Sequence, residues 1–420
     1  MLSFQNYCII TPDLGGIGGA QLYTIRRLNY LKSNHCKVFI VTGNTSNFKL
    51  KNNFEGIEIL EVPEISLNPI LFTNQRVKKT YNKLIKFLNN KSIQIIESHT
   101  LSNAIYAENI ANELKCKHII YLLNENKIKF NYGIGYSDFF YFKLNRRELF
   151  GVSSKSLDIV FSTKLDSQKN RYINIGYDVN ELTCEKNDII KQYLPSKNYD
   201  LKILTIARLD KHYIKILIKE FIKLSIIYPD KTFFLLIIGE STNNSILRKL
   251  KKSFKDIENC KIVFSGYIYP LPKEIFNYFD LFIGQGTASV VSISQGCATA
   301  IISDDYKSPG FLGIHTNNFG YAENGIKNIA IFELLISIIK NPNILILASE
   351  SGKNLFYNSY ENIKVMNHFD DEIIKSIQIK EYWFFTFKKT IRVHCEFVFI
   401  YFLGIKKYLS LFNKIAYYLK

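Results

Sequence analysis

Asp13-Leu-Gly-Gly-Ile-Gly-Gly-Ala-Gln21 follows an apolar run, Tyr7–Thr11, and precedes a helical stripe of Leu22, Ile25, Leu28 and Leu31. Glycines let the backbone approach a ligand closely, and a helix N-terminus presents free N–H groups to an anion. The spacing Gly16-x-Gly18-x-x-Gln21 lacks the third glycine of a dinucleotide fingerprint, and the next apolar run ends without an acidic residue. An anion-binding loop is therefore favoured over an NAD site, with a simple tight turn as the alternative.

Working outward from this loop, short β-rich runs alternate with helical patterns, which predicts βαβ units and mainly parallel sheets. In the first half we expect strands at Tyr7–Thr11, Lys37–Thr42, Glu58–Val62, Ile93–Glu97, His118–Leu123 and Asp158–Ser162. In the second half we expect them at Leu201–Ala207, Phe233–Ile238, Lys261–Phe264, Leu281–Ile283 and Thr299–Ile302. The sequence thus predicts two Rossmann-like domains, at 1–185 and 200–378, a linker at 186–199 and a tail at 379–420.

The composition is that of an ordinary globular chain with a basic surplus. Of 420 residues 47% are apolar, which excludes wholesale disorder, and 54 Lys and Arg against 37 Asp and Glu leave a charge of +17. Such a charge favours anionic partners. The seven cysteines are scattered singly, so we expect neither a zinc ribbon nor a disulfide framework, and a reducing compartment. We also expect no signal peptide and no transmembrane helix, since the longest apolar run, Phe397–Ile405, has nine residues.

Ordered motifs along the chain resemble those of GT-B glycosyltransferases, particularly glycosyltransferase family 4 of the surface-polysaccharide type. The motifs are Gly18-Gly-Ala-Gln21, Asn174-Ile-Gly-Tyr-Asp178, Thr205-Ile-Ala-Arg-Leu209, Ile237-Ile-Gly-Glu240, Phe264-Ser-Gly-Tyr267 and Asp280-Leu-Phe-Ile-Gly284. This resemblance implies two Rossmann-like domains facing a cleft that holds a nucleotide-sugar. It also implies that Gly18, Gly19 and Gly239 contact the donor.

Two cations follow a predicted strand at the place where open α/β sheets bind ligands. Arg208 and Lys211 come after Leu201–Ala207 and before a helix, and both charges can neutralise a diphosphate. The resemblance implies the same role, although the loop is one residue short, so that His212 could replace Lys211. Exposed cations without a ligand are the alternative.

A second cluster, Gly284-Gln-Gly-Thr-Ala-Ser289, resembles a glycine-rich variant of the family's donor site. Backbone amides near Gly286 and the hydroxyls of Thr287 and Ser289 suit a phosphate or ribose. The family glutamate that holds the donor ribose aligns with Val291, and the preceding family glutamate is missing, with Ile283 at its place. These departures imply a rearranged, weakened or lost donor site.

The first half offers fewer groups for proton transfer. The resemblance places Asn124 and Glu125 where the family often has a histidine and an acidic residue near the donor sugar. Glu125 suits sugar hydroxyls or the acceptor. His99 is a further candidate, against a structural role. No Asp-x-Asp motif of the metal-dependent glycosyltransferases occurs near a predicted strand end, so we expect neither a metal nor another cofactor.

The tail from Lys380 to Lys420 carries eight Lys or Arg, two Glu and thirteen aromatic residues. One helical face holds Ile405, Tyr408, Leu409, Phe412, Ala416 and Leu419, and the other holds Lys406, Lys407, Ser410, Asn413 and Lys414. This pattern favours a crossover helix near Ile379–Lys389 followed by an amphipathic segment on an anionic membrane surface. Nucleic-acid binding is disfavoured because no RNA-binding motif is present.

Together these observations predict a hexosyltransferase that moves a sugar from a nucleotide-sugar to a growing, lipid-linked surface glycan such as capsule or lipopolysaccharide. We expect retention of configuration, metal independence, and a cytoplasmic protein held peripherally at the inner face of the cytoplasmic membrane. The alternative is a non-catalytic GT-B scaffold in a glycan-assembly complex.

Overall fold

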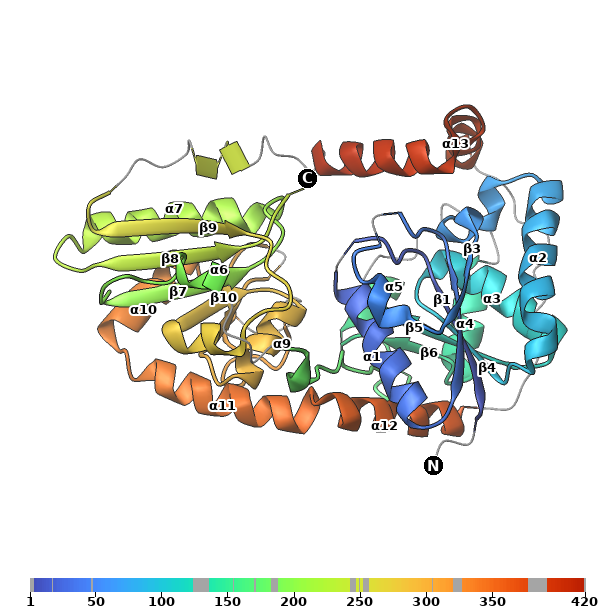
Figure 1. Cartoon of the computed structure of the whole chain (residues 1–420), viewed down its shortest axis with the longest axis horizontal. Coiled ribbons are helices and arrows are strands. Elements are labelled where there is room, and N and C mark those ends of the chain that lie inside the picture. The colour runs from blue at the N-terminus through green and yellow to red at the C-terminus, as the bar shows by residue number, and fades with distance from the viewer. Residues whose placement is uncertain are drawn as a thin grey trace. The chain divides into compact units, whose positions relative to one another are not determined.

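The computed structural model forms two compact units, which are considered separately (Figure 1). Unit 1 comprises Met1–Ile175 and Val365–Lys420, and unit 2 comprises Gly176–Lys364. The structure describes residues 4–16, 18–46, 48–123, 136–153, 155–169, 171–182, 188–241, 247–248, 250–251, 257–303, 305–319, 327–376 and 391–418. The segment 188–199, within the expected linker, belongs to unit 2, where Ile190 is buried.

Unit 1 is built on a six-stranded parallel sheet in the order β3-β2-β1-β4-β5-β6. Its strands are β1 (Asn6–Thr11), β2 (Lys37–Thr42), β3 (Glu58–Glu61), β4 (Ile95–Ser98), β5 (Lys117–Leu122) and β6 (Leu149–Gly151). Its helices are α1 (Gly19–Ser33), α2 (Asn74–Leu88), α3 (Leu101–Leu114), α4 (Tyr136–Asn145), α5 (Ser156–Phe161), most of α12 (Asn362–Lys375), and α13 (Ile391–Tyr418). Two short 3-10 helices, η2 (Pro63–Ser66) and η3 (Pro69–Leu71), precede α2.

Most strands of this sheet are predictable from the sequence because they are buried. A parallel sheet covered on both faces needs nearly continuous apolar strands, and β1, β2 and β5 are each buried at five of six positions. The expected strand at Asp158–Ser162 is wrong, because this segment is helix α5, which buries Leu157, Val160 and Phe161. The sixth strand is instead Leu149–Gly151.

The aromatic region at Lys127–Leu157, which the sequence presents as a surface excursion or an active-site insertion, is core in its described part. Phe139 and Phe140 of α4 and Phe150 of β6 are fully buried. Phe139 and Phe140 pack in one cluster with Ile120 and Leu122 of β5. The interpretation as a surface excursion is therefore wrong for this part.

Unit 2 has a second six-stranded sheet in the order β12-β11-β10-β7-β8-β9, parallel except for β12. The strands are β7 (Leu201–Ile206), β8 (Phe233–Ile238), β9 (Cys260–Gly266), β10 (Leu281–Gly284), β11 (Thr299–Ile301) and β12 (Gly310–Phe311). The helices are α6 (Asp188–Lys191), α7 (His212–Ile227), α9 (Thr287–Ser294), α10 (Ile331–Lys340) and α11 (Ile344–Ser359), with the 3-10 helix η7 (Lys273–Tyr278). The predicted fold class of two Rossmann-like units is confirmed.

The described part of the tail is helix α13, which bends at Gly404, where φ is 72°. Just after this bend, two residues of the predicted apolar face, Ile405 and Tyr408, are buried in a cluster with Leu71 and Phe72. Lys406 and Lys407 are exposed as expected. The expected crossover at Ile379–Lys389 lies outside the described residues. Among the helices that the structure describes, none alone is long and apolar enough to span a bilayer, and only α10 with α11, bent by 113°, passes as a pair on length and composition.

Candidate functional site

The candidate donor site lies at the point of the unit 2 sheet where the strand order reverses. The chain runs from β7 to β8 and β9 in one direction and places β10 and β11 on the other side of β7. In open α/β sheets, ligands bind outside the carboxyl ends of the two strands at such a point. Helices α7 and α9 follow these two strands, β7 and β10. The predicted residues all fall in these two connections or in the first turn of α9: Arg208, Lys211, Gly286, Thr287 and Ser289.

The connection from β7 to α7 presents positive charge. The Arg208 side chain is 68% exposed, and its Nε lies 3.3 Å from Oδ1 of Asp210. Lys211 is the residue before α7, and its backbone N–H donates to the carbonyl of Arg208 at 3.1 Å. No side chain caps α7, and His212 is its first residue, so the first-turn N–H groups add to the positive potential there.

The connection from β10 to α9 is a second anion-binding element. Gly286 precedes α9 with φ at 75°, a left-handed conformation that favours glycine, and no side chain caps this eight-residue helix. Thr287 is the first residue of α9, and Ser289 in its first turn is fully buried. Among the described residues, Oγ of Ser289 has no hydrogen-bond partner. A buried hydroxyl without a partner costs about 1–3 kcal/mol, which a ligand oxygen would recover.

Other positions expected from the family contribute packing. Val291 is 8% exposed in the core of unit 2, and Ile283 is fully buried in β10. Gly239 has φ at 145°, and a Cβ there would lie 1.9 Å from the carbonyl oxygen of Ala207. The glycine is therefore required for the close approach of the β7 and β8 ends, whether or not it contacts a ligand.

The glycine-rich loop of unit 1 occupies the equivalent point of the other sheet, where the order reverses between β1 and β4. Oδ1 of Asp13 accepts hydrogen bonds from the backbone N–H of Gly15 at 2.7 Å and from the amide of Asn44 at 3.0 Å. Burial raises the pKa of Asp13, although these two donors act to lower it. Gly18 precedes α1 without a side-chain cap, and α1 begins at Gly19. The loop is thus held by its own contacts and leaves its helix N-terminus for an anion.

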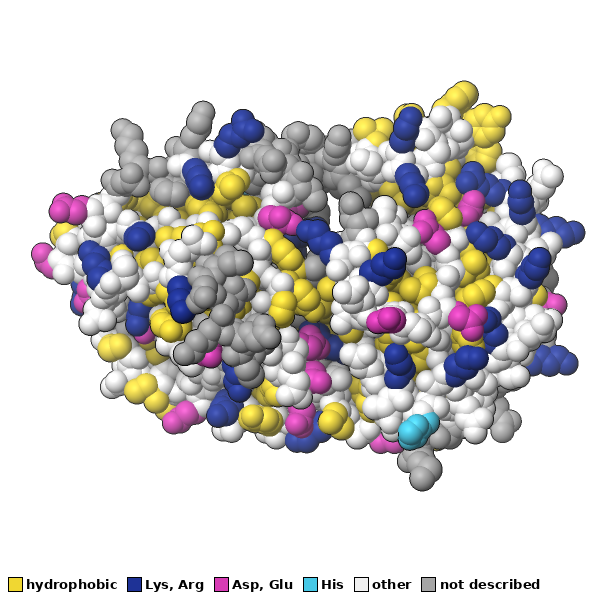
Figure 2. Space-filling model, viewed as in Figure 1, with side chains coloured by type: hydrophobic (Ala, Val, Ile, Leu, Met, Phe, Trp, Pro, Cys, Tyr) yellow, Lys and Arg dark blue, Asp and Glu magenta, His cyan; other side chains and the backbone are white. Residues whose placement is uncertain are grey.

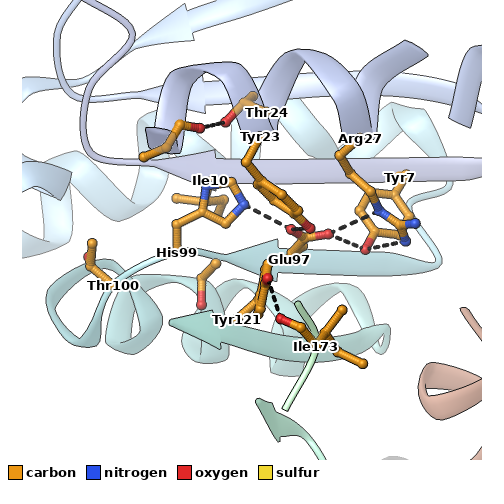
Figure 3. A network of polar contacts seen from close by, with 12 residues as sticks. Tyr7, Ile10, Tyr23, Thr24, Arg27, Glu97, His99, Thr100, Tyr121 and Ile173 are labelled. Atoms are coloured by element: carbon orange, nitrogen blue, oxygen red, sulfur yellow. Dashed lines mark hydrogen bonds and ion pairs between the residues drawn. The ribbon is translucent and has the colours of Figure 1, made fainter. Parts of the chain in front are cut away.

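A buried carboxylate holds a histidine at the end of β4 (Figure 3). Oε1 of Glu97 accepts from Nε2 of His99 at 2.8 Å and from the Tyr23 hydroxyl at 2.8 Å. Its Oε2 accepts from the Tyr7 hydroxyl at 2.6 Å and from Nε of Arg27 at 3.3 Å. Burial acts to raise the pKa of Glu97, but the hydrogen bond and charge of His99, the charge of Arg27 and the Tyr7 hydroxyl outweigh it and lower the pKa to about 2.

Because ionised Glu97 only accepts hydrogen bonds, Nε2 of His99 carries a proton and donates to it. Nδ1 has no hydrogen-bond partner among the described residues, and His99 is 1% exposed. Oγ1 of Thr11, at the end of the neighbouring strand β1, is likewise buried and unpartnered in the described part of the chain. Strands β1 and β4 pair with Ile10 opposite Ser98, so Thr11 and His99 follow these paired residues at the same edge of the sheet.

Sequence reasoning missed Thr11 and the role of Glu97. A carboxylate inside the apolar strand Ile95–Ser98 is the signal for the latter, since a charge in a buried strand needs partners. Thr11 gives no signal, because a threonine at a strand end is ordinary.

Asn124 and Glu125 lie outside the described residues. Among the residues that the structure does describe, no three His, Cys, Asp or Glu side chains gather in a way that could hold a metal ion. Independence from metal stays a prediction.

No known protein-family signature matches this sequence. No curated protein sequence matches it either. Solved structures do match in fold. A glycosyltransferase from Rickettsia africae has a TM-score of 0.65 at 15% identity over 89% of this chain and 99% of its own. Anabaena Alr3699/HepE, solved with UDP and glucose, has a TM-score of 0.61 at 11% identity over 88% of this chain and 99% of its own. The lipopolysaccharide outer core galactosyltransferase WaaB has a TM-score of 0.54 at 11% identity over 88% and 99%. These similarities show that the chain has the GT-B fold of those glycosyltransferases.

Proposed function

We propose that this protein is a glycosyltransferase that takes a hexosyl group from a nucleotide-sugar and passes it to a growing surface glycan. The observation that carries the proposal is the pair of uncapped helices, α7 and α9, at the reversal point of the unit 2 sheet. Arg208 lies before α7, and in the first turn of α9 the buried hydroxyl of Ser289 has no partner among the described residues. Two helix N-termini and a guanidinium suit the two negatively charged groups of a diphosphate.

The reaction that these groups serve is a substitution at the anomeric carbon. The bond from that carbon to the diphosphate oxygen breaks, and its electron pair leaves on the nucleoside diphosphate. An acceptor hydroxyl oxygen forms the new bond, and its proton passes to the departing phosphate oxygen. Arg208, Lys211 and the N–H groups of α7 and α9 lower the barrier by stabilising the charge that develops on the leaving group.

The proposal extends to the donor, the acceptor and the location of the protein. HepE has been solved with UDP-glucose, at 14% identity to this chain, which supports a uridine diphosphate sugar as the first donor to test. We further propose a lipid-linked acceptor, retention of configuration, no requirement for metal, and a peripheral position at the inner face of the cytoplasmic membrane.

A second candidate function is a non-catalytic GT-B scaffold. Val291 favours it, since an apolar side chain buried in the core stands where the resembling family carries a ribose-binding glutamate. The scaffold reading predicts a folded protein to which nucleotides do not bind.

Thermal unfolding with a panel of UDP- and GDP-sugars separates the two functions. A ligand that binds only the folded state raises its stability by about 2.7 kcal/mol at one hundred times its dissociation constant. We expect one nucleotide class to raise the midpoint, and the anomeric proton signal of the isolated product to reveal retention. If no member of the panel shifts the midpoint at millimolar concentration, the scaffold reading replaces the enzyme reading.

A further inference from the structure

The first half of α13 exposes a ridge of large apolar side chains. Tyr401 and Phe402 are 73% and 77% exposed, the highest values among the large hydrophobic residues that the structure describes. Val398, Phe399 and Leu403 add to the ridge. Hydrophobic side chains project over this part of α13 (Figure 2). Exposed apolar groups gathered in one segment mark a binding surface, whereas isolated ones are ordinary.

The opposite side of α13 fixes which residues point outward. Val393 and Ile400 from the first half, with Ile405 and Tyr408 from beyond the bend at Gly404, are buried against the segment around η3. Helix α13 is therefore seated on unit 1 by this buried face. The ridge consists of the apolar side chains on the part of its surface that the rest of the chain leaves exposed.

A basic helix packs against the same apolar cluster as α13. Helix α2, which follows η3, contains Arg76, Lys78, Lys79, Lys83 and Lys86 and no acidic residue. Val77 of α2 packs against the same cluster as α13. Lys78, Lys79 and Lys407 are exposed and form no ion pair with any described residue. Exposed apolar side chains and unpaired lysines on elements of the same unit match an anionic lipid surface, which offers an acyl boundary and negative headgroups.

We propose that unit 1 binds anionic lipid bilayers through the Val398–Leu403 ridge and through Lys78, Lys79 and Lys407. The proposal rests on the proposed function in that a lipid-linked acceptor is found at a membrane. It differs from the expectation drawn from the sequence, since Ile405 and Tyr408 hold the helix on the protein and the residues before Gly404 enter the lipid. The seat on unit 1 presents ridge and lysines to the bilayer as one preformed surface.

A vesicle sedimentation assay on the full chain tests this surface. We expect the protein to sediment with vesicles containing about one third phosphatidylglycerol, to bind pure phosphatidylcholine weakly, and to be released as salt rises. The double variant Tyr401→Ser/Phe402→Ser should lower the partition coefficient at least tenfold, as the loss of two buried aromatic side chains requires. Lys78→Gln/Lys79→Gln should lower it about fivefold per lysine at low salt, the equivalent of about 1 kcal/mol for each charge.

Matched controls come from unit 2. Ile226→Ser/Ile227→Ser removes two exposed apolar side chains from α7, and Lys340→Gln/Lys353→Gln removes two exposed charges. Both should bind vesicles as the unaltered protein does, and circular dichroism should show that all four variants are folded. Equal vesicle binding by Tyr401→Ser/Phe402→Ser, or no binding by the unaltered protein, would overturn the proposal.

Two further measurements identify which idea fails. Light scattering without lipid shows whether the ridge instead joins two copies of the chain. A dimer that Tyr401→Ser/Phe402→Ser makes monomeric, with no vesicle binding by either protein, also overturns the membrane proposal. UDP binding measured without lipid is independent of the ridge. Nucleotide binding without vesicle binding contradicts only this surface, and the reverse result contradicts only the proposed donor site.

Discussion

Nε2 of His99 lies 2.8 Å from Oε1 of Glu97, and Nδ1 of the same ring has no hydrogen-bond partner among the described residues. A second buried histidine of unit 1, His118, contrasts with it. His118 Nδ1 contacts Glu108 at 2.6 Å and Nε2 contacts the Ser98 hydroxyl at 2.8 Å, so both of its nitrogens are engaged. Both ring nitrogens of His118 are thus engaged, whereas one ring nitrogen of His99 has no partner in the described part of the chain.

This contrast predicts different consequences for the two histidines. His99→Asn should lower turnover by about 10²-fold with little change in nucleotide affinity, if Nδ1 forms a hydrogen bond with a hydroxyl of the sugar or the acceptor during the reaction. His118→Asn should lower the unfolding midpoint and leave the turnover of the folded fraction unchanged. Steady-state kinetics at a temperature where both variants are folded makes the comparison. Because His99 is almost fully buried, a purely structural role predicts instead that both variants lose stability alike and keep their turnover.

Glu97 predicts a dependence of stability on pH. Its folded pKa is lowered to about 2, from an ordinary value of about 4.3. The stability from this shift is therefore fully present above about pH 4.3 and is lost as the pH falls through about 2. The pKa of Glu108 is likewise lowered to about 2, because the charge of Lys143 and the His118 contact outweigh burial. Both carboxylates therefore contribute to the loss of unfolding free energy in acid.

Glu97→Gln should remove one part of that acid dependence. The variant should be destabilised at neutral pH by about 3–5 kcal/mol, because Arg27 is buried and loses one of its two charged partners among the described residues, the other being Asp370 at 2.7 Å. Chemical denaturation from pH 7 to pH 3 should give a shallower loss of unfolding free energy for Glu97→Gln than for the unaltered protein. Parallel curves would show that Glu97 is not the titrating group.

Ser289 offers a test that separates ligand binding from stability. Since its hydroxyl is buried without a partner in the described part of unit 2, Ser289→Ala should leave the free protein equally or more stable. The same variant should weaken nucleotide binding about five- to tenfold, the loss of one hydrogen bond to a charged group. Thermal unfolding with and without UDP measures both effects.

Ser292, one turn further along α9, is the matched control. Its Oγ accepts a hydrogen bond from the Thr299 hydroxyl at 2.8 Å, so Ser292→Ala should cost about 1 kcal/mol of stability and leave nucleotide affinity unchanged. A Ser289→Ala variant that loses stability as Ser292→Ala does, and binds UDP normally, would assign Ser289 to the core.

The parts of the fold predicted correctly are those set by continuous burial. Strands such as Lys37–Thr42 and Phe233–Ile238 match the observed bounds because apolar residues fill four central positions of the first and all six positions of the second. Asp158–Ser162 was misread because its β-branched and aromatic residues favour a strand locally, while burial of Leu157, Val160 and Phe161 follows a helical spacing. Short strands such as Gly310–Phe311 are defined by hydrogen bonds to a neighbouring strand, and two residues are too few to show a strand pattern in the sequence.

The candidate sites were predictable where chain order alone defines them. The residues after β7 and β10 follow from the rule for reversal points in open sheets. The network around Glu97 was not predictable, because it joins Tyr7, Arg27 and Asp370 from three segments that only the fold brings together. The burial of Ile405 and Tyr408 was not predictable either, since the sequence does not tell which face of a helix its own chain covers.

Calorimetric titration of UDP into the full chain, compared with Arg208→Ala, tests the central claim most directly. The Arg208 side chain is largely exposed, so its removal should leave the unfolding midpoint unchanged. Lys215→Ala, an exposed cation on α7 beyond its first turn, is the control. The account predicts that UDP binds the unaltered protein and Lys215→Ala equally and Arg208→Ala at least tenfold more weakly. Equal binding by all three proteins, or no binding of UDP or GDP at millimolar concentration to the folded chain, would contradict it.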